Sequence, residues 1–214
     1  MSSGTRSDWA PARFPEDPVA AQRLREWLQS GVGGLDAVGL NLRGSDLSHG
    51  DFSESWFTEG HLTDARLVGC EFYRSDAEGA DLDRANLTES SLVRVNLDEA
   101  TLRGAILDRA NLIKASLYGV DATGASCRGT RFMGSSLLEV SLRGADLSGA
   151  VFDENSFKVT LDRKTVLHGA TGTVFGPAEF VDMDQSHKLA GSDLQNWLRH
   201  QGADIQVIHK AAHS

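Results

Sequence analysis

Every fifth residue of this chain is apolar from Leu42 to Phe157. All 24 positions of that series hold Leu, Phe, Ala or Cys, and the residue two places before each is small except for Leu40 and Asn155 at the two ends. A period of five fits neither one amphipathic helix, at about 3.6 residues per turn, nor a strand, at about two. The repeat therefore predicts a solenoid.

Each unit of five offers two inward side chains, one large and one small. This pattern fits a chain that turns a corner in every unit, since the large side chain fills the axis and the small one lets the backbone turn tightly. Four such sides make a coil of about 20 residues. The inward residues are accordingly interpreted as core and not as sites.

The clearest units share the order Ala, then Asp or Asn, then Leu. They are Gly79–Asp83, Arg84–Thr88, Arg109–Ile113 and Gly144–Ser148. This order resembles the A(D/N)LXX signature of the pentapeptide-repeat family, and the match covers 24 consecutive units. The resemblance implies an all-β solenoid, a right-handed quadrilateral β-helix of about six coils without insertions. At about 4.8 Å per coil, six coils give a rod of about 29 Å.

The flanks predict covers for the two ends of the rod, because the end coils of a solenoid carry unpaired edges. We expect three regions. They are a disordered lead and N-terminal capping helix (1–34), the repeat β-helix (35–160) and a small C-terminal α/β cap (161–214).

Residues 17–28 predict the N-terminal capping helix. Asp17 is its N-cap, Pro18 opens the first turn and Gly31 stops it. Trp27 is expected to lie over the first coil, and residues 1–14 have no pattern and are expected to be disordered. The apolar face of the helix holds Ala20, Leu24, Trp27 and Leu28.

After Phe157 the register breaks, because Leu161 comes four residues later. The segments that follow predict strands at 173–176, 179–183 and 205–208, and a helix at 192–200 capped by Ser192 and stopped by Gly202. Trp197 and Leu198 could pack on the last coil or on a second molecule. The quinolone-resistance branch of the family implies a dimer through the C-terminal cap, and both alternatives stay open.

Composition agrees with one soluble, cytoplasmic domain plus caps. The 214 residues are 40% hydrophobic and hold no apolar run long enough to span a membrane, and residues 1–10 lack the features of a signal peptide. Cys70 and Cys127 fall in the two inward series almost three coils apart. We expect reduced core thiols, with no disulfide, metal or redox role.

Function is then sought on the outward positions, which a 20-residue coil sorts into four faces. The face centred on Phe57, Leu97 and Phe157 is acidic, and Lys158 is its only cation. It is a candidate partner-binding surface. Its acidic residues are Glu59, Asp76, Glu78, Asp98, Glu99 and Glu139.

A column of outward apolar residues runs beside the acidic face. Such columns tend to mark an interface, although β-branched and aromatic residues also stabilise cross-strand stacks wherever they lie. Both interpretations stay open. The column holds Tyr73, Val93, Ile113 and Met133, and Tyr118 and Leu138 add two apolar residues on the acidic side.

Three cations, Arg74, Arg94 and Lys114, also stack at intervals of 20. Like charges about 5 Å apart repel unless carboxylates intervene, and we expect Asp76, Glu89 and Glu99 to neutralise them. A phosphate-binding stripe is the alternative.

Charge points to a protein partner and away from nucleic acid or membrane. Residues 37–157 hold 11 basic and 19 acidic residues, and the whole chain has a net charge of −9. Such a surface repels DNA and RNA and favours cationic partners. Members of the quinolone-resistance and self-immunity branch are duplex-DNA mimics, so the resemblance implies binding to DNA gyrase or topoisomerase IV. The absence of a projecting loop favours inhibition or immunity over drug protection.

The alternative function is a general protein-binding scaffold, or a toxin-immunity or regulatory module, that acts through the apolar column or the C-terminal cap. An enzyme has little support. The sequence contains no G-x-G-x-x-G, P-loop or nucleophile elbow, and the seven histidines are scattered. We expect no catalytic residue, cofactor or metal.

Overall fold

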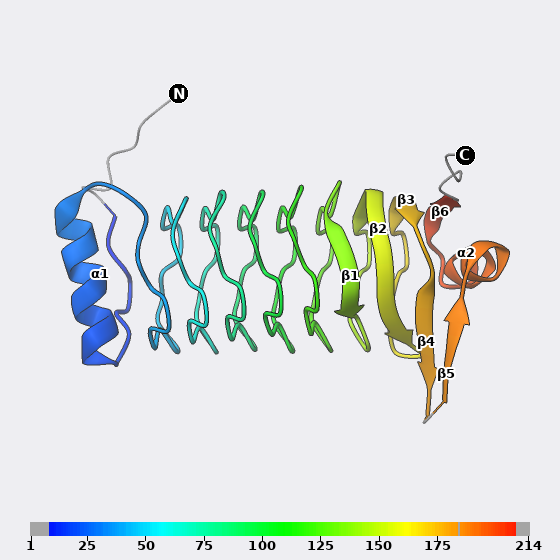
Figure 1. The fold of residues 1–214 in the computed structure, drawn as a ribbon, viewed down its shortest axis with the longest axis horizontal. Coiled ribbons are helices and arrows are strands. Elements are labelled where there is room, and N and C mark those ends of the chain that lie inside the picture. The colour runs from blue at the N-terminus through cyan, green and yellow to red at the C-terminus, as the bar shows by residue number, and fades with distance from the viewer. Residues whose placement is uncertain (1–8, 184, 209–214) are drawn as a thin grey trace, which may run out of the picture.

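The chain forms a straight rod with a helix at one end and a small sheet and helix at the other (Figure 1). The computed structural model describes residues 9–183 and 185–208. Helix α1 spans Pro18–Ser30 and helix α2 spans Gly191–His200. The strands are β1 (Ser136–Ser141), β2 (Val151–Asp162), β3 (Thr171–Phe175), β4 (Ala178–Asp182), β5 (Gln185–Leu189) and β6 (Asp204–Ile208).

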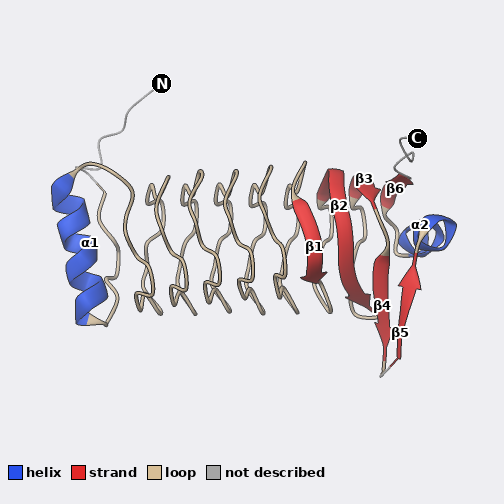
Figure 2. Cartoon of the chain, viewed as in Figure 1, coloured by secondary structure: helices blue, strands red, loops and turns tan. Residues whose placement is uncertain are grey.

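A ladder of parallel bridges joins each coil to the next. It pairs residues 20 apart, from Asp36 with Trp56 to Asp146 with Val166. Most bridges are single, so Figure 2 draws the coils as loops with no arrows. A repeated bond such as Leu62 N–H to Asp81 O, at 2.7 Å, connects the coils. The five-residue repeat thus folds as a β-helix solenoid with 20 residues in each coil.

The corners of the coils share one kind of four-residue turn. In the unit around Leu87, Ser90 N–H donates to Leu87 O at 3.1 Å and Glu89 lies between them with φ of 59°. A positive φ at the third position of a four-residue turn is typical of a type II turn. Glycine is suited to that position, yet arginine, glutamate and aspartate occupy it at many corners, including Glu89, Arg94 and Asp64.

The rod interior is a column of buried Leu and Phe, as the repeat predicts. Phe52 stacks on Phe72 with ring centroids 5.5 Å apart, and Phe132 stacks on Phe152 at 5.1 Å. Ala77 occupies a position that holds Leu or Phe in most units, and a small apolar cavity of about 20 Å³ lies beside it. A small cavity thus lies where Ala77 replaces a larger side chain.

Polar side chains in the small inward series bond to the backbone. Ser90 Oγ donates to Leu87 O at 2.7 Å, and Thr130 Oγ1 donates to Leu107 O at 2.6 Å. Cys70 Sγ lies 3.1 Å from Leu47 O. Burial raises the thiol pKa of Cys70 and of Cys127 to about 12, so both are protonated core residues.

Helix α1 covers the first coil as expected. Asp17 accepts a hydrogen bond from Ala20 N–H at 2.8 Å, and Gly31 ends the helix with φ of 66°. Trp27 is buried and stacks on Phe52 at 5.5 Å.

The expectation of disorder through residue 14 is wrong for residues 9–14, while residues 1–8 lie outside the described residues. Arg13 pairs antiparallel with Asp46 through two backbone bonds, Arg13 N–H to Asp46 O at 3.3 Å and Asp46 N–H to Arg13 O at 2.9 Å. Trp9 packs edge-on against Phe52 at 5.6 Å. This segment pairs with an edge that the first coil would otherwise expose.

The register break after Phe157 is local. Leu138 pairs with Lys158, its equivalent in the next coil, but Val140 pairs with Val159 and not with Thr160. The Asp162 carboxylate then accepts bonds from the N–H groups of Gly144, Lys164 and Thr165. Buried Thr165, Leu167 and Ala170 restore the repeat, so the ladder continues past the boundary expected at residue 160.

The C-terminal strands and β2 form one sheet in the order β5-β4-β2-β3-β6. Strands β3 and β4 both pair with β2, and α2 packs beside β6 (Figure 1). Two details differ from expectation. Strand β5 is not among the expected strands, and the N-cap of α2 is Ala190, with no side-chain cap, in place of Ser192.

Candidate protein-interaction surface

One side of the rod combines most of the outward residues that the sequence singles out. We name it the Trp56 face after the ladder in its middle, which runs Trp56, Asp76, Asn96, Ser116, Ser136 and Ser156. A corner borders it on each side. We call them the acidic corner (58–59, 78–79, 98–99, 118–119, 138–139 and 158) and the apolar corner (53–54, 73–74, 93–94, 113–114, 133–134 and 153–154).

Backbone bonds hold both corners in register from coil to coil. On the acidic corner Gly79 N–H donates to Asp98 O at 2.8 Å, and on the apolar corner Arg94 N–H donates to Ile113 O at 3.0 Å. Each outward residue therefore lies directly over its equivalent in the next coil, at about 4.8 Å.

Three of the expected acidic residues are open to a partner. Glu59, Glu78 and Glu99 are exposed, and among the described residues no cation lies within ion-pair distance of them. Carboxylates at these positions can form new ion pairs without breaking existing ones.

The other three expected acidic residues have partners within the chain. Asp76 accepts bonds from Glu78 N–H and Asn96 Nδ2, both at 3.1 Å. Asp98 accepts bonds from Ser116 Oγ at 2.6 Å and from Tyr118 N–H at 2.8 Å. Glu139 forms an ion pair with Lys158.

Several acidic residues elsewhere on the rod are neutralised by arginines. Arg84 pairs with Asp64 at 2.8 Å, Arg103 with Asp83 at 2.9 Å and Arg109 with Glu89 at 2.7 Å, each one coil apart. Hydrogen bonds and charge from Arg84 hold the pKa of Asp64 below its usual value. Opposite charges exactly one coil apart in the sequence were the signal for these pairs.

The apolar column lies on the apolar corner, as its spacing predicts. Tyr73 is 38% exposed, whereas Val93, Ile113 and Met133 are half-buried because each packs on the equivalent residues of adjacent coils. Tyr118 and Leu138, 47% and 37% exposed, lie on the acidic corner. Trp56, half-exposed in the middle of the face, was not singled out by sequence, although its outward position one coil before Asp76 indicated it.

The cation stripe Arg74, Arg94 and Lys114 is not neutralised in the way we expected. The Arg74 guanidinium lies 5.3 Å from the centre of the Tyr73 ring. Glu89 pairs with Arg109, and none of the three cations forms an ion pair within the described residues. The Trp56 face thus has unpaired cations on one border and unpaired carboxylates on the other.

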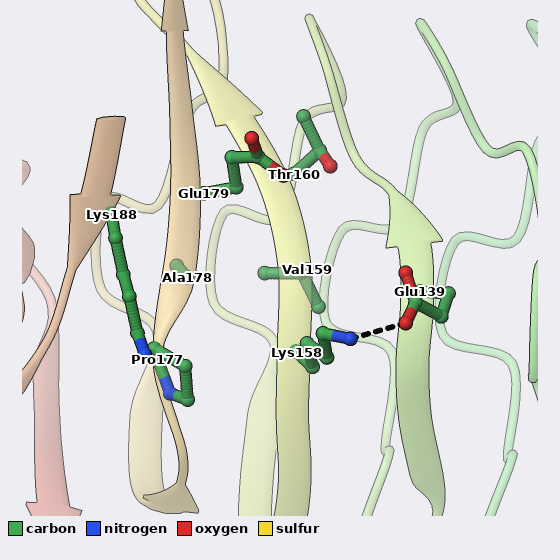
Figure 3. Close-up of a pocket in the computed structure, with 8 residues that line it drawn as sticks. All are labelled: Glu139, Lys158, Val159, Thr160, Pro177, Ala178, Glu179 and Lys188. Carbon is green, nitrogen blue, oxygen red and sulfur yellow. Dashed lines mark hydrogen bonds and ion pairs between the residues drawn. The ribbon is translucent and has the colours of Figure 1, made fainter. Parts of the chain in front are cut away.

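A groove lies between the acidic corner and the C-terminal strands, at the C-terminal end of the rod (Figure 3). Its volume is about 250 Å³, and the Lys158–Glu139 ion pair, Pro177 and Lys188 are among the residues that line it. An adjoining hollow of about 570 Å³ extends it past Leu138, Phe175 and Ile208. No group of three or more potential metal ligands occurs in the part of the chain that the structure describes.

The residues expected to serve a cap or a dimer lie mostly inside the molecule. Trp27 and Leu198 are buried, and half-buried Trp197 packs edge-on against Phe180 at 5.5 Å. In residues 9–183 and 185–208, no helix is both long and apolar enough to cross a membrane.

Several solved structures are similar to this chain. Rfr23 from the cyanobacterium Cyanothece 51142 shares 26% identity over 62% of this chain and 90% of its own, with a TM-score of 0.33. HetL from Nostoc sp. strain PCC 7120, involved in heterocyst differentiation regulation, shares 19% over 76% and 86%, with a TM-score of 0.29. QnrB1, a plasmid-mediated fluoroquinolone resistance protein, shares 17% over 83% and 89%, with a TM-score of 0.23.

No curated protein matches the chain in sequence. The family model described as "Pentapeptide repeats" matches eight copies, over residues 51–89, 80–117, 90–126 and 115–153. These segments lie within the 20-residue coils. The chain therefore belongs to the pentapeptide-repeat family.

Proposed function

We propose that this protein is a non-catalytic interaction rod whose acidic corner binds a cationic surface of a protein partner. The observation that carries the proposal is the difference between the corners. Asp64, Asp83 and Glu89 have arginine partners one coil away, while Glu59, Glu78 and Glu99 have none in the described part of the chain. Unpaired carboxylates on a rigid ladder are preorganised for a cationic partner.

The partner to test first is DNA gyrase or topoisomerase IV, in a resistance or self-immunity role. An enzyme surface that binds duplex DNA presents Lys and Arg to phosphates. A rod with carboxylates stacked at about 4.8 Å offers such a surface a regular row of negative charge. The family resemblance supports the same partner, with the rod taken as a right-handed, four-sided β-helix acting in the cytoplasm.

The second candidate is a scaffold that binds one protein through apolar contacts. Tyr118 and Leu138 are exposed, and Leu138 lies at the groove between the last coils and the C-terminal cap. Such a partner would need the apolar residues and tolerate charge reversal on the acidic corner. A homodimer through the C-terminal cap belongs to this proposal, with Trp197 as its contact.

A DNA supercoiling assay with purified gyrase tests the proposal. The variant Glu59→Lys, Glu78→Lys, Glu99→Lys reverses the open carboxylates without touching the bonded Asp76 and Asp98. Its matched control, Glu26→Lys, Asp51→Lys, Glu71→Lys, changes net charge equally on other surfaces.

Inhibition or quinolone protection by the wild type and the control, but not by the acidic-corner variant, is the expected result. No effect of the wild type at micromolar concentration would overturn gyrase as the partner. Equal loss in both variants would show that total charge, and not the corner, matters.

A further inference from the structure

We propose that two copies of this protein pair through their Trp56 faces, with the rods parallel and side by side. The occupant of the face is a second copy because the two borders of the face are complementary to each other. This inference uses the same surface as the proposed function but does not depend on it, and the two forms of binding would compete.

The geometry follows from the coil. A twofold axis parallel to the rods lays the apolar corner of one copy against the acidic corner of the other, at the same height on both sides of the interface. Residues on the two corners of one coil are four or five positions apart. With about 4.8 Å of rise per 20-residue coil, they differ in height by about 1 Å.

In this arrangement, residues of opposite charge face each other across the interface. Arg74 of one copy faces Glu78 of the other, and Arg94 faces Asp98 and Glu99. At the far end the signs exchange, because Glu154 on the apolar corner faces Lys158 on the acidic corner. Charge complementarity of this kind fixes which arrangement of two surfaces is favoured.

Between these charged ends, apolar residues meet. Ile113 faces Tyr118 and Met133 faces Leu138, so half-buried apolar residues of one corner lie on the same levels as exposed apolar residues of the other. An antiparallel arrangement would instead bring acidic corner to acidic corner. The order of charge and apolar residues along both corners therefore selects the parallel pair.

Two contacts oppose the pairing. Glu54 faces Glu59, and Asp76 in the middle of the face lies near its own copy. One narrow side of a rod is also a small contact, at the low end of what stable dimers bury. We therefore expect a weak, reversible dimer that salt dissociates.

The test is sedimentation equilibrium of the full chain over a concentration series, at about 50 mM and about 500 mM salt. Arg94→Glu alone and Glu99→Arg alone each put like charges together on both sides of the twofold axis. Each should weaken the dimer by about tenfold or more. Arg109→Glu is the matched control, because Arg109 has the same corner conformation (φ of 59°) on another edge of the rod.

Mixing the two single variants gives the deciding measurement. In a heterodimer of Arg94→Glu with Glu99→Arg, opposite charges face each other on both sides, so association should return. Asp76→Asn removes a like-charge contact at the axis and should strengthen the dimer. Circular dichroism melts confirm that every variant is folded.

A wild type that stays monomeric at all concentrations would overturn the proposal. So would a dimer that both single variants leave intact, since it would use another surface such as the C-terminal cap. If the mixture fails to associate better than either variant alone, the parallel twofold arrangement is wrong. Partner binding by the monomer would survive any of these failures, which separates them from failure of the proposed function.

Discussion

Arg84 lies directly over Asp64, one coil further along the rod, and its guanidinium bonds both carboxylate oxygens at 2.8 Å. The pair illustrates the rule of this fold, because residues 20 apart in sequence are neighbours in space throughout the regular coils. Charged residues that are 20 apart in sequence therefore lie together, where opposite charges neutralise each other and like charges add.

This pair gives a pH prediction. Hydrogen bonds and charge from Arg84 lower the pKa of Asp64 from its usual 3.8. Because the folded-state pKa is the lower one, the stabilisation is present above about pH 4 and is lost as pH falls through the folded-state pKa. Asp64→Asn should lower Tm slightly near neutrality, since the pair is exposed, and the difference from wild type should disappear in acid. A Tm difference that stays constant to the lowest pH at which both proteins fold would contradict this.

A charge in the axial column should unfold the rod. Leu112 is fully buried, and Leu112→Asp places a carboxylate without a partner among apolar side chains. We expect a loss of about 3 kcal/mol or more in unfolding free energy. Urea unfolding followed by circular dichroism measures it, with Lys114→Asp, an exposed change two residues away, as control. Equal stability of the two variants would refute the inward assignment.

The cavity beside Ala77 predicts a stabilising substitution. The space of about 20 Å³ lies where most units hold Leu or Phe, so the two methyl groups that Ala77→Val adds should fill it and raise stability by about 1 kcal/mol. Ala100→Val, at a fully buried position of the small inward series, should instead overpack and cost about 1 to 3 kcal/mol. Thermal melts of both variants give the comparison, and destabilisation by Ala77→Val would show that the cavity cannot accept a methyl group.

The corner conformation predicts opposite effects of glycine and alanine. Gly124 has φ of 70° and open space where a side chain would begin, so Gly124→Ala should cost about 1 kcal/mol from backbone strain alone. Glu54 has φ of 56° and no ion pair among the described residues, so Glu54→Gly should be neutral or stabilising. Chemical denaturation measures both, and a stabilising Gly124→Ala would contradict the turn assignment.

Burial predicts that both cysteines are unreactive in the folded protein. Cys70 and Cys127 are buried with thiol pKa values of about 12. Since the thiolate is the reactive form, a thiol reagent should modify neither in the folded protein and both after unfolding. Fast labelling of the native protein at neutral pH would show that the coils open locally.

Sequence periodicity was enough for the β-helix because the fold is set by a repeated local rule. The series from Leu42 to Phe157 points inward throughout, and helix α1 begins and ends at its predicted residues. Periodicity could not predict structure that depends on a single, unrepeated contact or strand pairing. Trp9 lies in an aperiodic segment, and polar β5 is a strand only because β4 supplies its hydrogen bonds.

The sequence spacing predicted which columns of residues form the candidate surface, but not which residues in a column are free to bind a partner. Spacing placed Glu99 and Asp98 together, yet only the bonds from Ser116 and Tyr118 show that Asp98 is occupied and Glu99 is open. Glu89 was assigned to the wrong cations for the same reason. Which neighbour a charged side chain selects depends on its rotamer, and periodicity carries no information on that choice.

The 20-residue ladder also means that the number of residues in the repeat sets both the length of the rod and the direction in which its end faces. Deleting one complete coil, residues 80–99, would rejoin Gly79 to Ala100 in register and shorten the molecule by about 4.8 Å with every column intact. Deleting a single unit of five would instead turn everything beyond it by one side of the coil. The C-terminal groove would then face a different direction from Glu59 and Glu78, so the length of this rod can change by whole coils without changing how its surfaces are oriented.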